Sequence, residues 1–225
     1  MSRKKRFQAR FFLRTLWGAF LLMPLSAQEP HLQIVAATGT PSEIQEALWH
    51  GADINNMTVT GVTPLMVAAG SNHDPGVVPV LLNSGANINA RNKFGETALI
   101  CAAQYNKNPD MITALLKAGS DVRDRDVLGR TPLIHAAKCN SNPEVINLLL
   151  KAGCAVDTRD LMGMTALLYA AWQNQNPKIV TMLLQAGADA KARSNEGKTA
   201  LDYAWENPLL PSDSEAFLAL EKASK

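Results

Sequence analysis

Histidine and cysteine, the side chains that most often bind metals or act as nucleophiles, are scarce in this chain. Its 225 residues include four histidines and three cysteines. No two histidines stand at the spacing of a metal site, and the cysteines do not form a Cys-x-x-Cys pair. A glycine-rich phosphate loop, a Gly-x-Ser-x-Gly turn and a constellation of paired carboxylates are missing as well. The sequence therefore predicts no metal site, no cofactor and no enzymatic activity.

Acidic residues are absent before Glu29, although six basic residues lie in that stretch. An apolar segment, TLWGAFLLMPLSA, follows the basic residues and closes on small side chains. Because this order is typical of an export signal, we expect residues 1–27 to be a signal peptide that is cleaved near Ala27–Gln28. The alternative is a retained membrane anchor, but the unbroken apolar run, 16–25, is only half the roughly 20 residues that a spanning helix needs.

The basic excess of the whole chain resides in this N-terminal segment. Without residues 1–27, 16 basic residues stand against 20 acidic ones, which gives a net charge of −4 with neutral histidines. A net acidic chain offers no electrostatic reason to expect binding to nucleic acid or to an anionic membrane surface.

What the sequence does contain is a 34-residue repeat. The phrases NHDP, NKNP, NSNP and NQNP end at Pro75, Pro109, Pro143 and Pro177, and the interval between them is constant. The full units are 61–94, 95–128, 129–162 and 163–196. We expect a degenerate N-terminal capping unit at 28–60 and a C-terminal capping unit with a tail at 197–225.

Each unit is predicted to contain two helices. The first helix has a threonine N-cap at Thr63, Thr97, Thr131 and Thr165. Its end is expected at an asparagine in a left-handed backbone conformation, at Asn72, Asn106, Asn140 and Asn174. The second helix is expected to be capped by Asp74, Asn108, Asn142 and Asn176 and stopped by Gly85, Gly119, Gly153 and Gly187. The recurring phrase is therefore interpreted as a helix-to-helix turn.

These features resemble the ankyrin repeat. The segments GETALICAA…LLKAGSDVRDRD and GRTPLIHAA…LLLKAGCAVDTRD carry that family's Thr-Pro-Leu start, paired alanines, double leucine and Gly-Ala-Asp turn. The resemblance spans roughly residues 31–207. It implies an all-α repeat solenoid, in which stacked helix-turn-helix units with short hairpin loops share one continuous core. The Asn-x-(Asn/Asp)-Pro turn departs from the family and lengthens its usual unit by one residue.

The repeat also argues against the one histidine–cysteine pair with helical spacing. His135 precedes Cys139 by four residues, which places both on one helix face. The slot of His135 holds Val67, Cys101, Tyr169 and Tyr203 in the other units. A slot that accepts these residue types is expected to be a packing position.

No disulfide is expected, even in an exported protein. The separation of Cys101 and Cys139 is one full repeat plus four positions. Neighbouring units of such folds place these positions about 10 Å apart, which is too far for a disulfide. Cys154 is expected in a turn. We therefore predict three free thiols.

The resemblance further implies a surface that binds another protein. In proteins that look like this one, the partner usually lies against the hairpin tips and the inner face of the first helices. Mapped onto this chain, the candidate anchors are Phe94, Tyr105, Leu128, Leu161, Met162, Met164 and Trp172. Phe94, Leu128 and Met162 stand in register, so the alternative is that they cover the seam between hairpins. Tyr105, Met164 and Trp172 have no apolar equivalent in every unit, which favours a role in binding.

A second set of residues that recurs with the repeat consists of arginines. Arg91, Arg125, Arg159 and Arg193 recur at the interval of the repeat. Such a ladder either binds an acidic partner or braces successive hairpins, and the sequence favours bracing.

Together these features predict an exported scaffold that binds another protein through its concave hairpin and first-helix face. We expect it to be monomeric, to lie in a bacterial periplasm, and to bind neither nucleic acid nor, beyond its N-terminal segment, a membrane. The alternatives are a secreted effector or inhibitor that docks on a foreign enzyme, and a scaffold anchored by an uncleaved signal.

Overall fold

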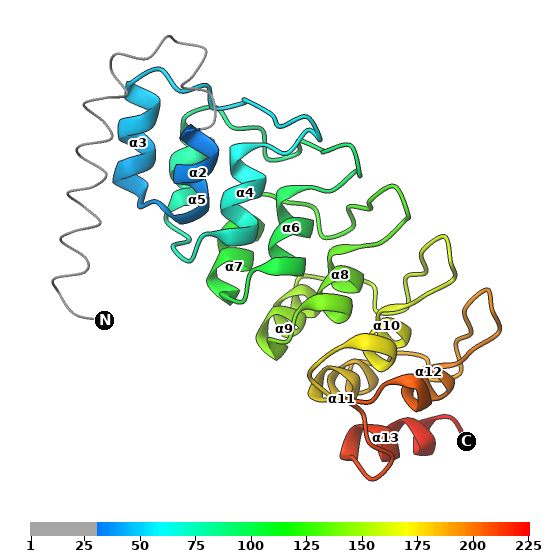
Figure 1. Ribbon diagram of the computed structural model, residues 1–225. Helices are drawn as coiled ribbons and strands as arrows, with labels where there is room; N and C mark the ends of the chain where they lie inside the picture. Colours follow the sequence, from blue (N-terminus) through cyan, green and yellow to red (C-terminus); the bar gives the residue numbers. More distant parts are fainter. Residues whose placement is uncertain (1–30) are drawn as a thin grey trace, which may run out of the picture.

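The structure, a computed structural model, describes residues 31–225. Within that range the chain forms twelve α-helices and no strand. The helices make six pairs that follow one another along an elongated array (Figure 1). The first helices of the pairs are α2 (His31–Thr38), α4 (Pro64–Ser71), α6 (Ala98–Tyr105), α8 (Pro132–Cys139), α10 (Ala166–Gln173) and α12 (Ala200–Glu206). The second helices are α3 (Pro41–Trp49), α5 (Val77–Asn83), α7 (Pro109–Lys117), α9 (Pro143–Lys151), α11 (Lys178–Gln185) and α13 (Glu215–Ala223).

The predicted all-α repeat solenoid is confirmed, whereas the predicted signal peptide, 1–27, lies outside the described residues.

The helices are arranged in two rows. In one row α6 packs between α4 and α8, and in the other α9 packs between α7 and α11. The hairpin loops between pairs project from one side of the array, beside the row of first helices (Figure 1). The paired alanines, such as Ala102–Ala103 and Ala136–Ala137, are completely buried. Their small side chains let neighbouring first helices approach closely.

Most of the predicted caps form. Thr63, Thr131 and Thr165 each accept a hydrogen bond at 3.3 Å from the backbone N–H three residues later, whereas Thr97 holds the N-cap position without a side-chain bond. The second-helix caps Asp74, Asn108, Asn142 and Asn176 each accept a bond from the N–H two residues later. Helices α5 and α11 nevertheless begin after their turn proline, with Gly76 and Pro177 as the N-cap residues. The predicted stops Gly85, Gly119, Gly153 and Gly187 have positive φ angles of 88° to 95°.

The predicted left-handed conformation of the turn asparagines is wrong. Asn72, Asn106, Asn140 and Asn174 have φ angles of −77°, −86°, −89° and −70°. Each instead turns its buried side chain toward the preceding helix pair. The amide of Asn140 donates to the carbonyls of Ala103 and Asn106 at 3.0 and 2.8 Å. Its oxygen accepts from the N–H of Asn142 at 2.9 Å, which closes its own turn.

This contact recurs along the array and forms an asparagine ladder. Its members are Asn72, Asn106, Asn140, Asn174 and Asn207, and each donates to at least one carbonyl of the preceding pair. The cap asparagines add a second contact, since Asn108 and Asn142 donate to the carbonyls of His73 and Lys107. The recurring phrase is therefore both a turn and a link between neighbouring pairs. This double role explains why the phrase keeps a constant interval.

The hairpin loops are joined in the same way. The N–H groups of Lys93, Val127 and Leu161 donate to the carbonyls of Thr60, Phe94 and Leu128 on the preceding hairpin, each at 2.9 Å. The arginine ladder supports this row, because Arg91, Arg125 and Arg159 each donate to the carbonyl of the next arginine in the series. The arginine side chains therefore brace successive hairpins against one another.

Candidate partner-binding face

An aromatic cluster lies on the inner face, which is the surface of the first helices beside the hairpins. The ring of Trp172 lies 6.3 Å from that of Tyr169 and 5.6 Å from that of Tyr203, measured between centroids. Both tyrosines are buried, and their hydroxyls are hydrogen-bonded, to Asp160 at 2.8 Å and to Ser194 at 3.1 Å. Trp172 remains 39% exposed. The indole ring of Trp172 is therefore held in place by two buried tyrosine rings and is still partly exposed to solvent.

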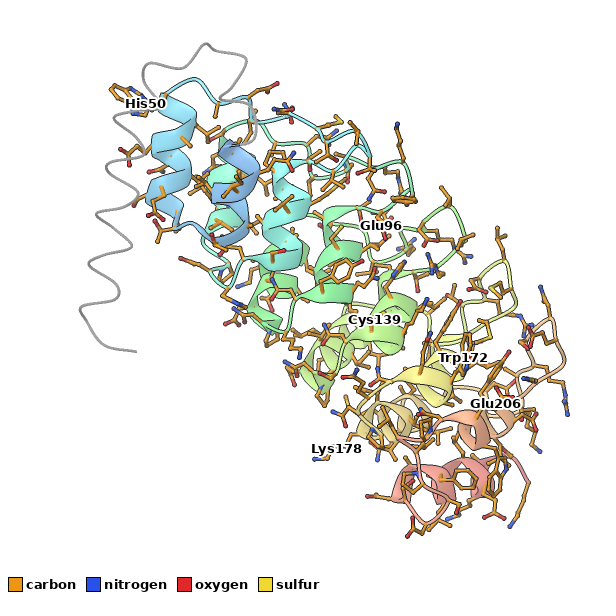
Figure 2. All side chains as sticks on the ribbon, viewed as in Figure 1. His50, Glu96, Cys139, Trp172, Lys178 and Glu206 are labelled. Atoms are coloured by element: carbon orange, nitrogen blue, oxygen red, sulfur yellow. The ribbon has the colours of Figure 1, made fainter. Side chains whose placement is uncertain are left out.

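Charged side chains surround this cluster. The ammonium group of Lys138 lies 5.4 Å from the ring centroid of Tyr169, and that of Lys198 lies 5.3 Å from the ring centroid of Tyr203. Lys198 also forms an ion pair with Glu206 at 2.6 Å. Cys139, Trp172 and Glu206 follow one another along successive first helices (Figure 2). An exposed aromatic centre with a polar rim is the arrangement that protein interfaces favour.

Tyr105 stands on the same face, nearer the N-terminus, and is 61% exposed. Its ring lies over Gly70 of α4, where a Cβ atom would be 3.7 Å from Tyr105 Cδ2. Partial burial and the negative charge of Glu96 raise the pKa of its hydroxyl. The hydroxyl is therefore a neutral donor at physiological pH.

The hairpin candidates lie in the turns of the loops. Phe94, Leu128, Leu161 and Met162 are 54%, 41%, 69% and 50% exposed. The carbonyls of Phe94, Leu128 and Met162 accept hydrogen bonds from the next hairpin. Their backbone therefore belongs to the seam between hairpins, while their side chains are open to a partner.

Met164 does not fit the predicted set of anchors. It is 1% exposed and belongs to the hydrophobic core. Its N–H donates to Asp160 at 2.9 Å, which fixes the backbone at the base of the hairpin with the side chain inward. The equivalent residues Glu96, Arg130 and Lys198 are partly exposed, so comparison between units gave the wrong expectation here.

His135 and Cys139 do not form a catalytic pair. The ring of His135 is 1% exposed and its Nε2 atom lies 3.0 Å from Asp126 Oδ2, an oxygen that also accepts from the guanidinium of Arg130 at 2.7 Å. Burial, reinforced by the positive charge of Arg130, lowers the pKa of His135 despite the opposing effect of Asp126. Burial also raises the pKa of the Cys139 thiol. The histidine is therefore neutral and structural, and the cysteine is not activated.

This buried histidine makes stability depend on pH. In the unfolded chain a histidine has a pKa near 6.5, and the folded-state pKa of His135 is lower. As pH falls below about 7 the unfolded state takes up a proton that the native state does not, so stability decreases. We expect His135→Tyr to remove part of this decrease, because the slot holds Tyr169 and Tyr203 in neighbouring units. Thermal melts of both proteins between pH 8 and 5 test this, and parallel curves would contradict it.

All three cysteines are free, as predicted, with Cys101 and Cys154 buried and Cys139 exposed. Burial raises the pKa of both Cys101 and Cys154 to about 12. Between residues 31 and 225 no group of three or more histidine, cysteine or carboxylate side chains is placed to hold a metal ion. Over the same range no helix is long and apolar enough to cross a membrane.

The family model for ankyrin repeats, which describes three copies, matches the chain twice, over residues 32–126 and 106–194. The two matches together cover more than half of the sequence and follow the helix pairs. The chain belongs to the ankyrin-repeat family. Ankyrin repeats typically mediate protein–protein interaction, and the family is generally a non-enzymatic scaffold. A search of curated proteins found no significant match to this ankyrin-repeat chain.

The contact of Trp172 with Tyr169 and Tyr203 is not predicted by the sequence analysis, which identifies only that the two tyrosines occupy the same packing slot of successive units. The available signal was the three-residue spacing of Tyr169 and Trp172 on one helix, together with the recurrence of tyrosine at the same slot of the next unit. Trp205 was also missed: it is 67% exposed and packs edge-on against Phe217 at 4.6 Å.

Proposed function

We propose that this ankyrin-repeat protein is an exported scaffold that binds another protein on its concave face, with Trp172 and Tyr105 as the main anchors. The observation that carries the proposal is the fixed position of Trp172, 39% exposed on two buried, hydrogen-bonded tyrosines. An aromatic side chain that is already ordered loses little conformational freedom when a partner covers it. Exposed aromatic residues of this kind contribute most of the binding energy at many interfaces.

Tyr105 lies one repeat before Cys139, and Trp172 lies one repeat after Lys138, so a partner that contacts both must span three first helices, α6, α8 and α10. The small, exposed side chain of Cys139 lies between them. The partner is therefore expected to be a folded surface or a continuous segment rather than a single side chain.

The test is capture from an envelope extract of the native host with the tagged chain, followed by titration of the captured partner. The double variant Tyr105→Ala, Trp172→Ala is expected to bind at least about 30-fold more weakly, as loss of a central aromatic anchor usually produces. Trp49→Ala is the matched control, because Trp49 is 83% exposed but ends α3 in the other row of helices. Equal loss with both variants, or no loss with the double variant, would rule out this face.

Export to a bacterial periplasm is part of the proposal and rests on the composition of residues 1–27. We expect the protein from the periplasmic fraction to begin near Gln28. N-terminal sequencing checks this, and a protein that begins at Met1 in the membrane fraction would favour the anchored alternative.

A further inference from the structure

The hairpin tips form a surface of their own, which we call the hairpin edge. Its apolar members are Val59, Phe94, Val127, Leu128, Leu161 and Met162, and their exposed fractions run from 41% to 88%. The loops that carry them project from one side of the array (Figure 1). Single exposed apolar residues are ordinary, whereas six gathered on one edge are typical of an interaction site.

Positive charge lies directly beside these tips. The exposed basic residues of the edge are Arg91, Lys93, Arg125, Arg159 and Arg193. The acidic residues of the same turns face the other way: Asp126 is buried against Arg130 and His135, and Asp160 is buried against Tyr169. Asp124 forms an ion pair with Arg91, and Glu196 is exposed in the last hairpin. Exposed basic side chains therefore outnumber exposed acidic ones at the tips, although residues 28–225 carry a net charge of −4.

We propose that the hairpin edge docks on an anionic lipid bilayer. The apolar tips would enter the boundary between headgroups and acyl chains, and Lys93, Arg125, Arg159 and Arg193 would lie among the lipid phosphates. This order of layers, with apolar side chains outermost and basic groups behind them, is that of proteins bound at a membrane surface. Arginine suits this position because a guanidinium that donates one N–H to the next hairpin, as in Arg125, keeps other N–H groups for a phosphate.

The shape of the edge favours a bilayer over a protein helix. Successive tips are tied together by backbone hydrogen bonds of 2.9 to 3.0 Å, from Thr60 to Asn195, and make a continuous ridge. A partner helix is usually bound in an apolar groove, whereas a ridge of protruding tips matches a broad, deformable surface. The acidic remainder of the molecule would also orient the edge toward the membrane.

The experiment is co-sedimentation of the full chain with vesicles of phosphatidylcholine alone or with about one third phosphatidylglycerol. We expect binding to the anionic vesicles that weakens with added salt. The variant Phe94→Ser, Leu161→Ser is expected to bind at least about tenfold more weakly, because two apolar side chains no longer enter the lipid. Leu218→Ser is the matched control: Leu218 is 51% exposed on α13, away from the hairpins. Because residues 1–27 are themselves basic and apolar, the same three proteins are also compared as chains that begin at Gln28, which removes the contribution of that segment.

A second variant separates charge from folding. Lys93→Glu leaves the apolar tips intact and is expected to weaken binding to anionic vesicles only, while its thermal melt stays that of the native chain. Native-like vesicle binding by the Phe94, Leu161 variant would overturn the proposal, as would a native chain that does not bind either kind of vesicle. If these variants still bind vesicles but no longer bind an acidic protein that the native chain captures, the hairpin edge is a protein-binding site and not a membrane-binding one. Trp172→Ala should not change vesicle binding, so this test is independent of the scaffold function.

Discussion

Replacing Asn140 with alanine is expected to destabilise the protein by about 3–5 kcal/mol, because it removes three buried hydrogen bonds at once. The carbonyls of Ala103 and Asn106 lose their donor, and the N–H of Asn142 loses its acceptor. Asn140 is 1% exposed, so water cannot replace these partners without opening the turn. Equilibrium unfolding in urea measures the change.

Asn147→Ala in the same unit is the control. Asn147 donates to Glu144 on the surface of α9 at 3.2 Å, an exposed contact within one helical turn. Its loss should cost less than about 0.5 kcal/mol. Asn140→Asp keeps the size and the acceptor but removes the donor, and it is expected to be at least as harmful as alanine. If Asn140→Ala and Asn147→Ala unfold at the same urea concentration, the ladder does not hold the units together.

The loss at Asn140 should also weaken the coupling between units. Neighbouring pairs in a repeat array are stabilised mainly by the interface they share. Asn140 joins α8 and its turn to the pair formed by α6 and α7. We therefore expect the variant to unfold over a broader range of urea, with the two halves of the array separating at this interface.

The ladder also shows which features the sequence could predict. Threonine caps, glycine stops and helix spacing depend on groups within a few residues, so their pattern identified the helix pairs correctly. The function of Asn140 depends on carbonyls of the preceding unit, those of Ala103 and Asn106, and local turn chemistry suggested a left-handed residue instead. The usable signal was its recurrence in every unit, since a turn alone would accept other residues.

The binding face was predicted in part for a similar reason. Tyr105 and Trp172 occupy first-helix slots that hold different residue types in other units, and this variation, visible in the sequence, correctly indicated exposed positions. Met164 varies in the same way but is buried. Its burial depends on how the hairpin base packs on the first helices, which one unit does not reveal. The sequence likewise could not predict that Asp126 is buried while the basic residues of the hairpin edge are exposed.

Gly95→Ala is expected to destabilise the protein by about 3 kcal/mol, through two separate effects. Gly95 has a φ angle of +76°, where an alanine is strained by about 1 kcal/mol or more. A Cβ atom there would also lie 2.9 Å from the N–H nitrogen of Val127 and 3.2 Å from Cα of Asp126, on the next hairpin. That N–H donates to Phe94 at 2.9 Å, so the added methyl group would push apart the two hairpins that this bond joins.

Gly197→Ala separates these two effects. Gly197 has the same role at the start of its unit and a φ angle of +80°, but no further hairpin packs against it within residues 31–225, and a Cβ atom would meet nothing within 4 Å. Only the backbone strain remains, so the expected loss is about 1 kcal/mol. The difference between the two variants in urea unfolding then measures how tightly successive hairpins are docked. Equal losses would mean that the hairpins move apart freely, and a ridge that yields so easily could not present the tips of the hairpin edge as one continuous surface.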